Sequence, residues 1–133
     1  MILATGIRPR NPHIPGIEHP KVMNYLDVLR DHKPVGSKVA VIGAGGIGFD
    51  VAEYLVDKPG ERSRDHWLKE WGIDKSLGER GGLIPPQIDA PERQIWLLQR
   101  KESKVGDGLG KTTGWIHRTA LKNRQVQMLA GVQ

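Results

Sequence analysis

The feature that most constrains this chain is an apolar segment, residues 38–42, that leads directly into the pattern Gly-x-Gly-x-x-Gly. Its glycines are Gly43, Gly45 and Gly48. In such a turn the first glycine permits the tight bend, the second lets the backbone approach a pyrophosphate, and the third allows close packing of helix on strand. The following helix directs unpaired N–H groups and the positive end of its dipole at the anion. The segment therefore predicts a dinucleotide-binding turn.

The residues around the glycines have the order that this turn requires. Val39 to Ile42 form a continuous apolar run, which is typical of a strand covered on both faces of a parallel sheet. Downstream, apolar residues recur at helical spacing, and no proline occurs before Pro59. These residues are Ile47, Val51, Ala52, Leu55 and Val56.

The rest of the chain extends this start into a repeating pattern. We predict strands over residues 38–42, 93–100 and 125–129, with helices over residues 46–57 and 113–124. The β-α-β-α-β order implies a parallel sheet with right-handed crossovers. The predicted fold class is therefore α/β, a Rossmann-like, three-layer NAD(P)-binding domain in truncated form.

The domain organisation follows from composition and spacing. Residues 1–36 are rich in proline and glycine and include one short helical pattern, so we predict a connecting segment with a linker helix. Residues 37–133 form the predicted nucleotide-binding domain, with an insertion over residues 57–91, because a dinucleotide-binding βαβ unit usually spans about thirty residues. Within the insertion, residues 63–71 predict a helix capped by Ser63 that covers the sheet or forms a lid or docking surface.

Composition argues against several classes of function. The chain has 20 Lys and Arg against 15 Asp and Glu, but these residues are scattered, and it has one Phe and two Tyr. This pattern argues against nucleic-acid binding and fits a phosphate-rich cofactor. The lack of cysteine excludes disulfides and thiolate-bound zinc or iron–sulfur clusters in this chain. The five histidines lack metal-site spacing, so we expect no metal.

The first residues give an expectation about location. Only a few apolar residues precede Thr5, and no basic residues stand before them. This stretch is too short for a signal peptide or a membrane span. We therefore expect a cytoplasmic protein without a membrane partner.

The residues after the second predicted strand indicate which dinucleotide is bound. At this place NAD sites have an acidic residue for the ribose 2′-hydroxyl, whereas NADP sites have basic residues for the 2′-phosphate. Arg100 and Lys101 end the strand here, and Lys104 follows closely. Because arginine can bind a dianionic phosphate bidentately, we favour NADPH, although Glu102 lies in the same loop.

Two further segments lie near the expected site. Residues 106–114 lack the spacing of an ATP-binding P-loop, and we expect a flexible cover beside the 2′-phosphate that leads into a helix capped by Thr112 or Thr113. Asp50 is expected on the first turn of the helix after the glycines, where a bound dinucleotide passes. No arrangement of residues typical of catalysis is present, so no catalytic residue is predicted.

Longer motifs resemble one family. Residues 4–10, Ala-Thr-Gly-Ile-Arg-Pro-Arg, are similar to the crossover between the FAD and NAD(P)H domains of two-dinucleotide-domain flavoproteins. The other landmarks are residues 25–29, 46–50, 70–74, 98–101 and 108–118. Together they closely resemble bacterial NADPH-dependent 2,4-dienoyl-CoA reductases along nearly the whole chain, the insertion included.

The resemblance implies a reaction and a place in it. Hydride would pass from NADPH to FAD, and electrons would then pass through a 4Fe-4S cluster to FMN, which reduces a 2,4-dienoyl-CoA in fatty-acid β-oxidation. This chain would supply the NADPH-binding portion and would be inactive alone. Residues 1–36 would include the crossover from the FAD domain, and the partners would be the FAD domain and the FMN barrel of the full enzyme.

The resemblance also implies roles for individual residues. The pyrophosphate would be held by the turn that comprises Gly43, Ala44, Gly45, Gly46, Ile47 and Gly48. Arg100, Lys101 and Lys104 would bind the 2′-phosphate. Asp50 would lie near the nicotinamide, and Thr5 and Gly6 would face FAD.

Other interpretations stay open. One is a non-catalytic nucleotide-binding or interaction module, and another is the same domain of an enoate reductase or a trimethylamine dehydrogenase-like enzyme. The basic residues after the second strand favour an NADPH role over the first of these. Because the chain stops soon after the third strand, we expect an open edge on strand 38–42. Either the N-terminal segment or a second copy would cover this edge, and we predict a homodimer or a swapped arrangement.

Overall fold

The computed structural model describes residues 1–57 and 63–133. Their contacts divide the chain into two compact units, residues 1–35 and residues 36–133, which we describe separately. The first unit is irregular apart from α1 (Tyr25–Leu29).

The short helix α1 begins with a reciprocal cap. The Asn24 side chain accepts hydrogen bonds from the backbone N–H groups of Leu26 and Asp27, and the Asp27 carboxylate accepts one from the backbone N–H of Asn24. Lys33 donates to the same carboxylate, and these hydrogen bonds lower the pKa of Asp27, that from Lys33 most strongly. Side-chain capping thus supports a helix too short to be stable by propensity alone.

The second unit is built on a parallel sheet of three strands. They are β1 (Lys38–Ile42), β2 (Gln94–Leu98) and β3 (Gln127–Leu129), hydrogen-bonded in the order β1-β2-β3. Helix α2 (Gly46–Val56) follows β1, and α4 (Gly114–Asn123) follows β2. The predicted α/β class and the β-α-β-α-β order are confirmed.

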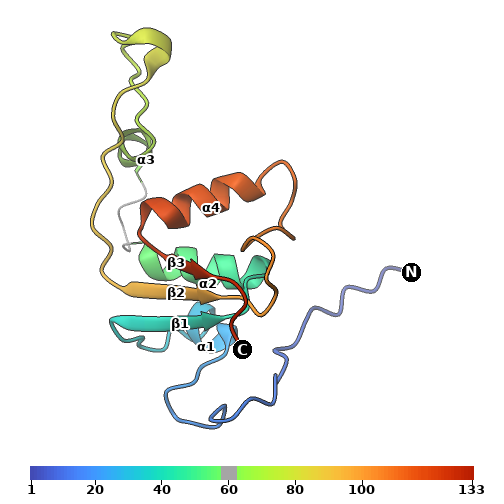
Figure 1. The fold of residues 1–133 in the computed structure, drawn as a ribbon. Coiled ribbons are helices and arrows are strands. Elements are labelled where there is room, and N and C mark those ends of the chain that lie inside the picture. The colour runs from blue at the N-terminus through green and yellow to red at the C-terminus, as the bar shows by residue number, and fades with distance from the viewer. Residues whose placement is uncertain (58–62) are drawn as a thin grey trace. The chain divides into compact units, whose positions relative to one another are not determined.

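Both helices lie on the same side of the sheet (Figure 1). Each right-handed crossover moves in the same direction along the sheet, and this places both helices on one face. The core on that face is formed by the buried side chains of Phe49, Ala52, Leu55, Ile95, Leu97 and Leu121. The other face is more open, since Ile42 is 65% exposed and Leu129 is 44% exposed. A helix on that face would need a crossover in the opposite direction, which the described strands do not make.

The insertion after α2 contains α3 (Arg64–Glu70) and a short 3-10 helix, η1 (Arg80–Gly82). The predicted helix is confirmed, and its N-cap Ser63 accepts a hydrogen bond from the backbone N–H of His66. Figure 1 shows this segment extending away from the sheet. Residues 58–62 of the predicted insertion lie outside the described residues.

A buried ion pair attaches the insertion to the rest of the unit. Arg124, the C-cap of α4, donates through Nε to Oε1 of Glu70 at 3.0 Å. Only 7% of the Arg124 side chain and 14% of the Glu70 side chain are exposed. Helix α3 is therefore held at the C-terminal end of α4, while Trp67 on the same helix is 51% exposed.

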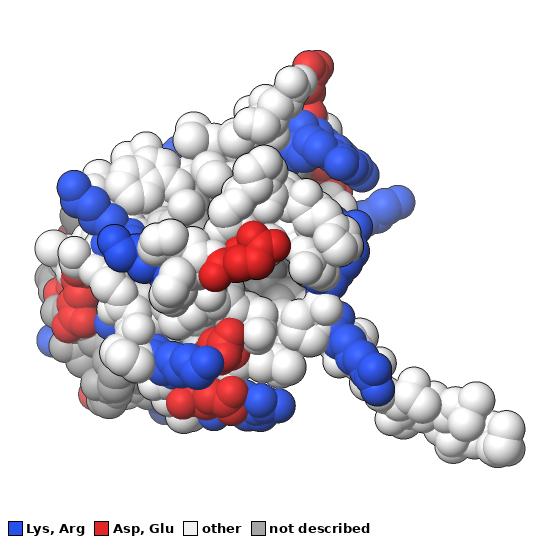
Figure 2. Space-filling model, turned by 90° about the horizontal axis from the view of Figure 1, so that it is seen from below, with Lys and Arg blue, Asp and Glu red and all other residues white. Residues whose placement is uncertain are grey.

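Charged side chains of both signs are mixed on the surface. On the face seen in Figure 2, Lys and Arg lie among Asp and Glu instead of forming one basic patch. Of the helices in residues 1–57 and 63–133, none has the length and apolar character needed to cross a membrane.

Candidate functional site

The glycine turn joins the end of β1 to the start of α2. Gly43 has a φ of +110°, a conformation that residues with a Cβ rarely adopt, and its N–H donates to the carbonyl oxygen of Leu98 at 2.9 Å. This hydrogen bond ties the turn to the end of β2. A Cβ built on Gly48 would lie 1.8 Å from the carbonyl oxygen of Gly43. Only glycine at position 48 therefore lets α2 begin directly against the turn.

The N-terminus of α2 is open to a ligand. Gly45 is the N-cap and offers no side-chain acceptor, and no acidic residue occurs in the first turn. A Cβ built on Gly45 or on Gly46 would meet no described atom within 4 Å. The first N–H groups of the helix thus face space that a phosphate oxygen can enter, and the helix dipole favours negative charge there.

Asp50 lies farther along α2 than predicted from the sequence. Because the helix begins at Gly46 and has about 3.6 residues per turn, Asp50 falls in the second turn, and the prediction of a first-turn position was wrong. The side chain is exposed. The first turn therefore stays free of a carboxylate that would repel a phosphate.

The basic loop follows β2 at the same edge of the sheet as the glycine turn. Because parallel strands end at one edge, Gly43 after β1 and Arg100 after β2 belong to that edge. Arg100, Lys101 and Lys104 are all exposed. The chain after β3 joins the loop, since the N–H of Gly131 donates to the carbonyl oxygen of Lys101 at 3.0 Å.

The segment after this loop is anchored to both helices. Val105 and Gly106 are buried, and a Cβ on Gly106 would lie 2.8 Å from Cζ of Phe49 in α2. Arg118 in α4 donates through Nη1 to the carbonyl oxygen of Gly106 at 2.9 Å. The helix N-cap is Thr113, whose side chain makes no capping hydrogen bond. The segment expected as a flexible cover thus has defined contacts beside α2.

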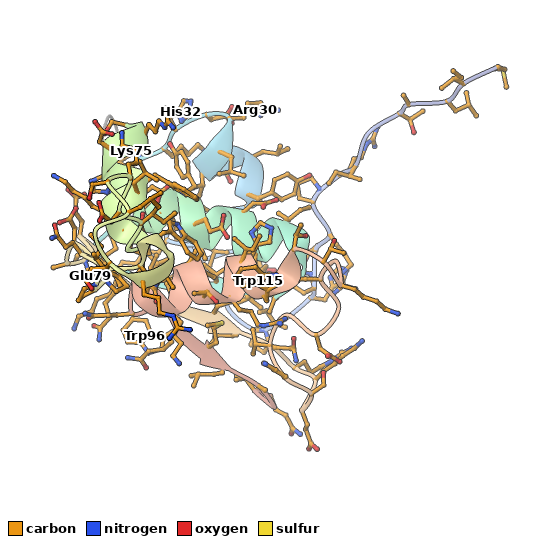
Figure 3. The ribbon with its side chains drawn as sticks, turned by 90° about the horizontal axis from the view of Figure 1, so that it is seen from above. Arg30, His32, Lys75, Glu79, Trp96 and Trp115 are labelled. Carbon is orange, nitrogen blue, oxygen red and sulfur yellow. The ribbon has the colours of Figure 1, made fainter. Side chains whose placement is uncertain are left out.

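One of the three predicted basic residues lines a pocket. Lys104 lines a pocket of about 540 Å³ together with Arg118 and Lys122 of α4, whereas Arg100 and Lys101 do not line it. Trp115, near the N-terminal end of α4, is 54% exposed at this pocket (Figure 3). Lys122 could not be predicted from the sequence, because only the fold brings this residue, one helical turn after Arg118, to the same pocket as Lys104.

His117 has a partner within the domain. Its Nδ1 lies 2.7 Å from Oε1 of Glu53, a half-buried contact that joins α4 to α2. Among the described residues, no group of three or more His, Asp or Glu side chains is arranged to hold a metal ion.

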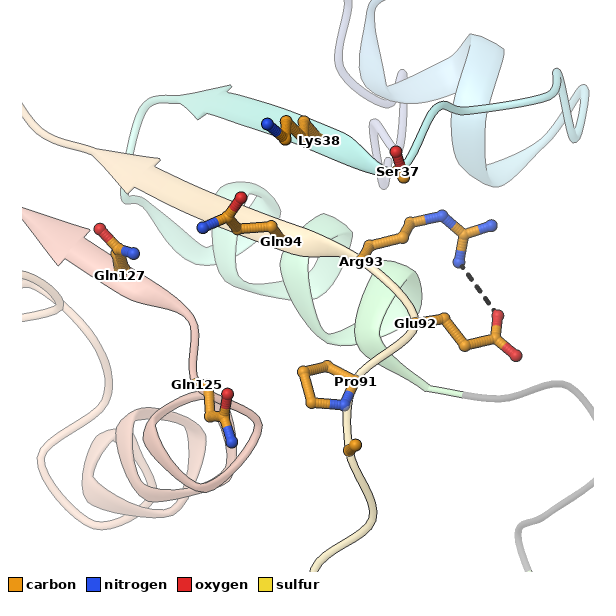
Figure 4. A pocket seen from close by; sticks show the side chains of 9 residues that line it. Ser37, Lys38, Pro91, Glu92, Arg93, Gln94, Gln125 and Gln127 are labelled. Atoms are coloured by element: carbon orange, nitrogen blue, oxygen red, sulfur yellow. Dashed lines mark ion pairs between the residues drawn. The ribbon is translucent and has the colours of Figure 1, made fainter.

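A second pocket, of about 530 Å³, lies at the opposite edge of the sheet, where the strands begin (Figure 4). Lys38, Gln94 and Gln127 line it from the three strands. Arg93 also lines this pocket and donates to the carbonyl oxygen of Leu55 at 3.1 Å. Since the glycine turn follows the other end of β1, this pocket is separate from the turn.

Thr5 and Gly6 belong to the first unit. Both are exposed and lie in irregular chain, and Gly6 has a φ of +72°.

Comparison with known proteins identifies the class of domain. The profile of the family described as pyridine nucleotide-disulphide oxidoreductase matches residues 1–133. A metal reductase from Desulforamulus reducens is 26% identical over 132 residues, which are 97% of this chain and 19% of that protein. A cinnamate reductase from Clostridium sporogenes is 44% identical over 55 residues, which are 41% of this chain and 8% of that protein.

A solved structure has the same fold. A 2-naphthoyl-CoA reductase in complex with 2-naphthoyl-CoA matches with a TM-score of 0.65 and 19% identity, over 98% of this chain and 14% of that chain. The matched part of the chain therefore spans less than a fifth of the length of each of these three proteins.

Proposed function

Because this chain belongs to the pyridine nucleotide-disulphide oxidoreductase family, we propose that it is the NADPH-binding portion of a flavin-dependent oxidoreductase. The family implies nucleotide and flavin cofactors in general. The observation that carries the proposal is the open N-terminus of α2 at the same sheet edge as a loop with three exposed basic residues. The first feature suits a pyrophosphate, and the second suits an additional phosphate group.

The groups present fit a dinucleotide. The N–H groups of Gly46, Ile47 and Gly48 would bind the pyrophosphate, with Gly43 and Ala44 forming the turn and Gly45 leaving room for the phosphate oxygens. When bound, the reduced nicotinamide supplies a hydride to a flavin. Asp50, on the second turn of the same helix, is proposed to lie on the nicotinamide side.

Arg100, Lys101 and Lys104 are proposed to select NADPH over NADH. The NADPH 2′-phosphate is a dianion, and a planar guanidinium can bind two of its oxygens at once. None of these three basic residues forms a hydrogen bond or an ion pair through its side chain with the described part of the chain. Their charges are therefore available to a ligand.

For the complete enzyme we propose the 2,4-dienoyl-CoA reductase type, acting in fatty-acid β-oxidation, on the strength of the sequence motifs. FAD, the 4Fe-4S cluster and FMN would then be held by other domains, which are the proposed partners, with Thr5 and Gly6 facing FAD. This chain has no cysteine to ligate a cluster and is proposed to be inactive alone. An enoate reductase is the alternative, supported by the similarity to a cinnamate reductase.

The free edge of β1 is a further place for a partner. Among the described strands β1 pairs only with β2, so one row of its backbone groups is available to another strand. A homodimer through this edge stays a prediction.

Titration of the chain with NADPH and NADH by isothermal calorimetry tests the proposed function. We expect NADPH to bind about tenfold or more tightly than NADH, and Arg100→Ala to remove most of that difference because it deletes the bidentate contact. Arg80→Ala, an exposed arginine in the insertion, is the matched control and should bind both nucleotides as the wild type does. Equal affinities for the two nucleotides, unchanged in Arg100→Ala, would refute the proposal.

A further inference from the structure

We propose that Gln99 is a positioning residue for coenzyme selection, whose side-chain amide holds residues 100–104 in the shape that presents their basic side chains to a 2′-phosphate. The inference rests on the proposed function, since it concerns how the same site distinguishes NADPH from NADH. Gln99, the first residue after β2, lies within the landmark of residues 98–101, but the sequence pattern assigns it no role.

The amide of Gln99 closes the loop on itself. Its Nε2 donates to the carbonyl oxygen of Ser103 at 2.7 Å and to that of Lys101 at 3.1 Å. A primary amide has two N–H donors, and the two carbonyls use both of them. The loop is thus bent back over the residue from which it starts.

The backbone around Gln99 is held from the neighbouring strand. The N–H of Gln99 donates to the carbonyl oxygen of Leu129 at 2.8 Å, and the carbonyl of Gln99 accepts from the N–H of Val132 at 3.0 Å. The Lys101 carbonyl accepts from Gly131 as well as from Gln99, so both of its lone pairs are used. The side chain that closes the loop therefore projects from a fixed point at the end of the sheet.

The charges of the loop explain why such a closure is needed. Arg100, Lys101 and Lys104 stand within five residues and are exposed, with Glu102 as the one carboxylate among them. Like charges on a short exposed loop repel and favour an extended, mobile chain. Hydrogen bonds to backbone carbonyls hold the loop without neutralising its cations. The basic side chains are then ordered before the ligand arrives, so binding of a phosphate costs less free energy.

Gln99→Met tests this role, because methionine keeps the length of the side chain and removes both donors. Gln94→Met is the matched control, since Gln94 lies at the other end of β2 and lines the separate pocket. Calorimetric titrations with NADPH and NADH are combined with hydrogen exchange of the amides of residues 100–104. For Gln99→Met we expect NADPH to bind about tenfold more weakly, NADH to change less than about twofold, and the loop amides to exchange faster.

The outcomes separate this inference from the proposed function. If the wild type binds no NADPH, the proposed function fails, and the inference fails with it. If the wild type binds NADPH and Gln99→Met binds it equally well, only the inference is overturned. An equal loss of NADPH and NADH affinity would also overturn it, because a general structural role weakens both. Gln94→Met should match the wild type in every measurement.

Discussion

Replacing Gly48 with alanine is expected to lower the free energy of unfolding by about 3 kcal/mol, the upper end of the usual cost of an extra group in a packed site. The added Cβ would lie 1.8 Å from the carbonyl oxygen of Gly43 and 3.0 Å from its carbonyl carbon. Both are backbone atoms that cannot rotate aside, so α2 and the turn must separate. NADPH affinity should fall too, because the turn and the helix N-terminus form the proposed site. Urea unfolding followed by circular dichroism measures the change.

Two neighbouring glycines provide matched controls. Alanine at Gly46 meets no described atom within 4 Å and should leave stability unchanged or raise it by up to about 1 kcal/mol through helix propensity. Alanine at Gly45 should also preserve the fold, but its methyl group enters the space assigned to the pyrophosphate and should weaken NADPH binding. Wild-type stability in Gly48→Ala contradicts the packing argument, and unchanged NADPH binding in Gly45→Ala contradicts the position of the site.

Removing the carboxylate of Glu70 is expected to have a similarly large effect. Glu70→Leu leaves the Arg124 guanidinium, on a side chain that is 7% exposed, without its ion-pair partner. Its Nη1 is already buried without a hydrogen-bond partner among the described residues, so no other described group compensates. Breaking a buried pair from one side typically costs about 3 kcal/mol or more. Urea unfolding measures the loss, and we expect α3 to show faster hydrogen exchange because this pair attaches it to α4.

The double variant Glu70→Leu, Arg124→Met tests whether the stability lost in Glu70→Leu comes from the unpaired charge of Arg124. With both charges replaced by apolar groups, much of the lost stability should return. Asp65→Asn is the control, because Asp65 pairs with Lys75 on the exposed surface of the insertion and its loss should leave the free energy of unfolding nearly unchanged. If Glu70→Leu is as stable as Asp65→Asn, the ion pair does not hold the insertion.

The fold could be predicted from the sequence because its signals are local. The apolar run before Gly43 ends where β1 ends, and Ser63 caps α3 as a serine before a helical pattern should. The glycine spacing predicted a tight turn and a helix. Gly43 has the positive φ that favours glycine, and Gly48 lies too close to the carbonyl oxygen of Gly43 to carry a Cβ. Each of these features depends on residues close together in the chain.

The contacts that shape the site could not be predicted because they join distant segments. Arg118 holds the carbonyl of Gly106, and Glu70 meets Arg124 across 54 positions. Gln99 acts on carbonyl groups only two and four residues away, but the sequence does not reveal which backbone carbonyls a loop turns inward. The prediction for Asp50 was wrong for a simpler reason. Asp50 is the fifth residue of α2, just beyond the first turn, so an error of one or two residues changes the turn to which it is assigned.

The similar proteins clarify what this chain determines. Their names describe a metal reductase, a cinnamate reductase and a 2-naphthoyl-CoA reductase, and the matched residues cover 19%, 8% and 14% of these proteins. The first two reductases are similar to this chain in sequence and the third in fold, although their names refer to different substrates. The similarity therefore supports the proposed nucleotide-binding portion and favours no single substrate.

The most direct test of the nucleotide site is a map of NADPH binding by two-dimensional NMR on the 14.8 kDa chain. We predict that the largest amide shift changes fall on residues 43–48 and 100–104, at one edge of the sheet. Gln94 and Gln127, which line the pocket at the opposite edge, should be unaffected. Shift changes centred on that second pocket, or none at saturating NADPH, would contradict the account.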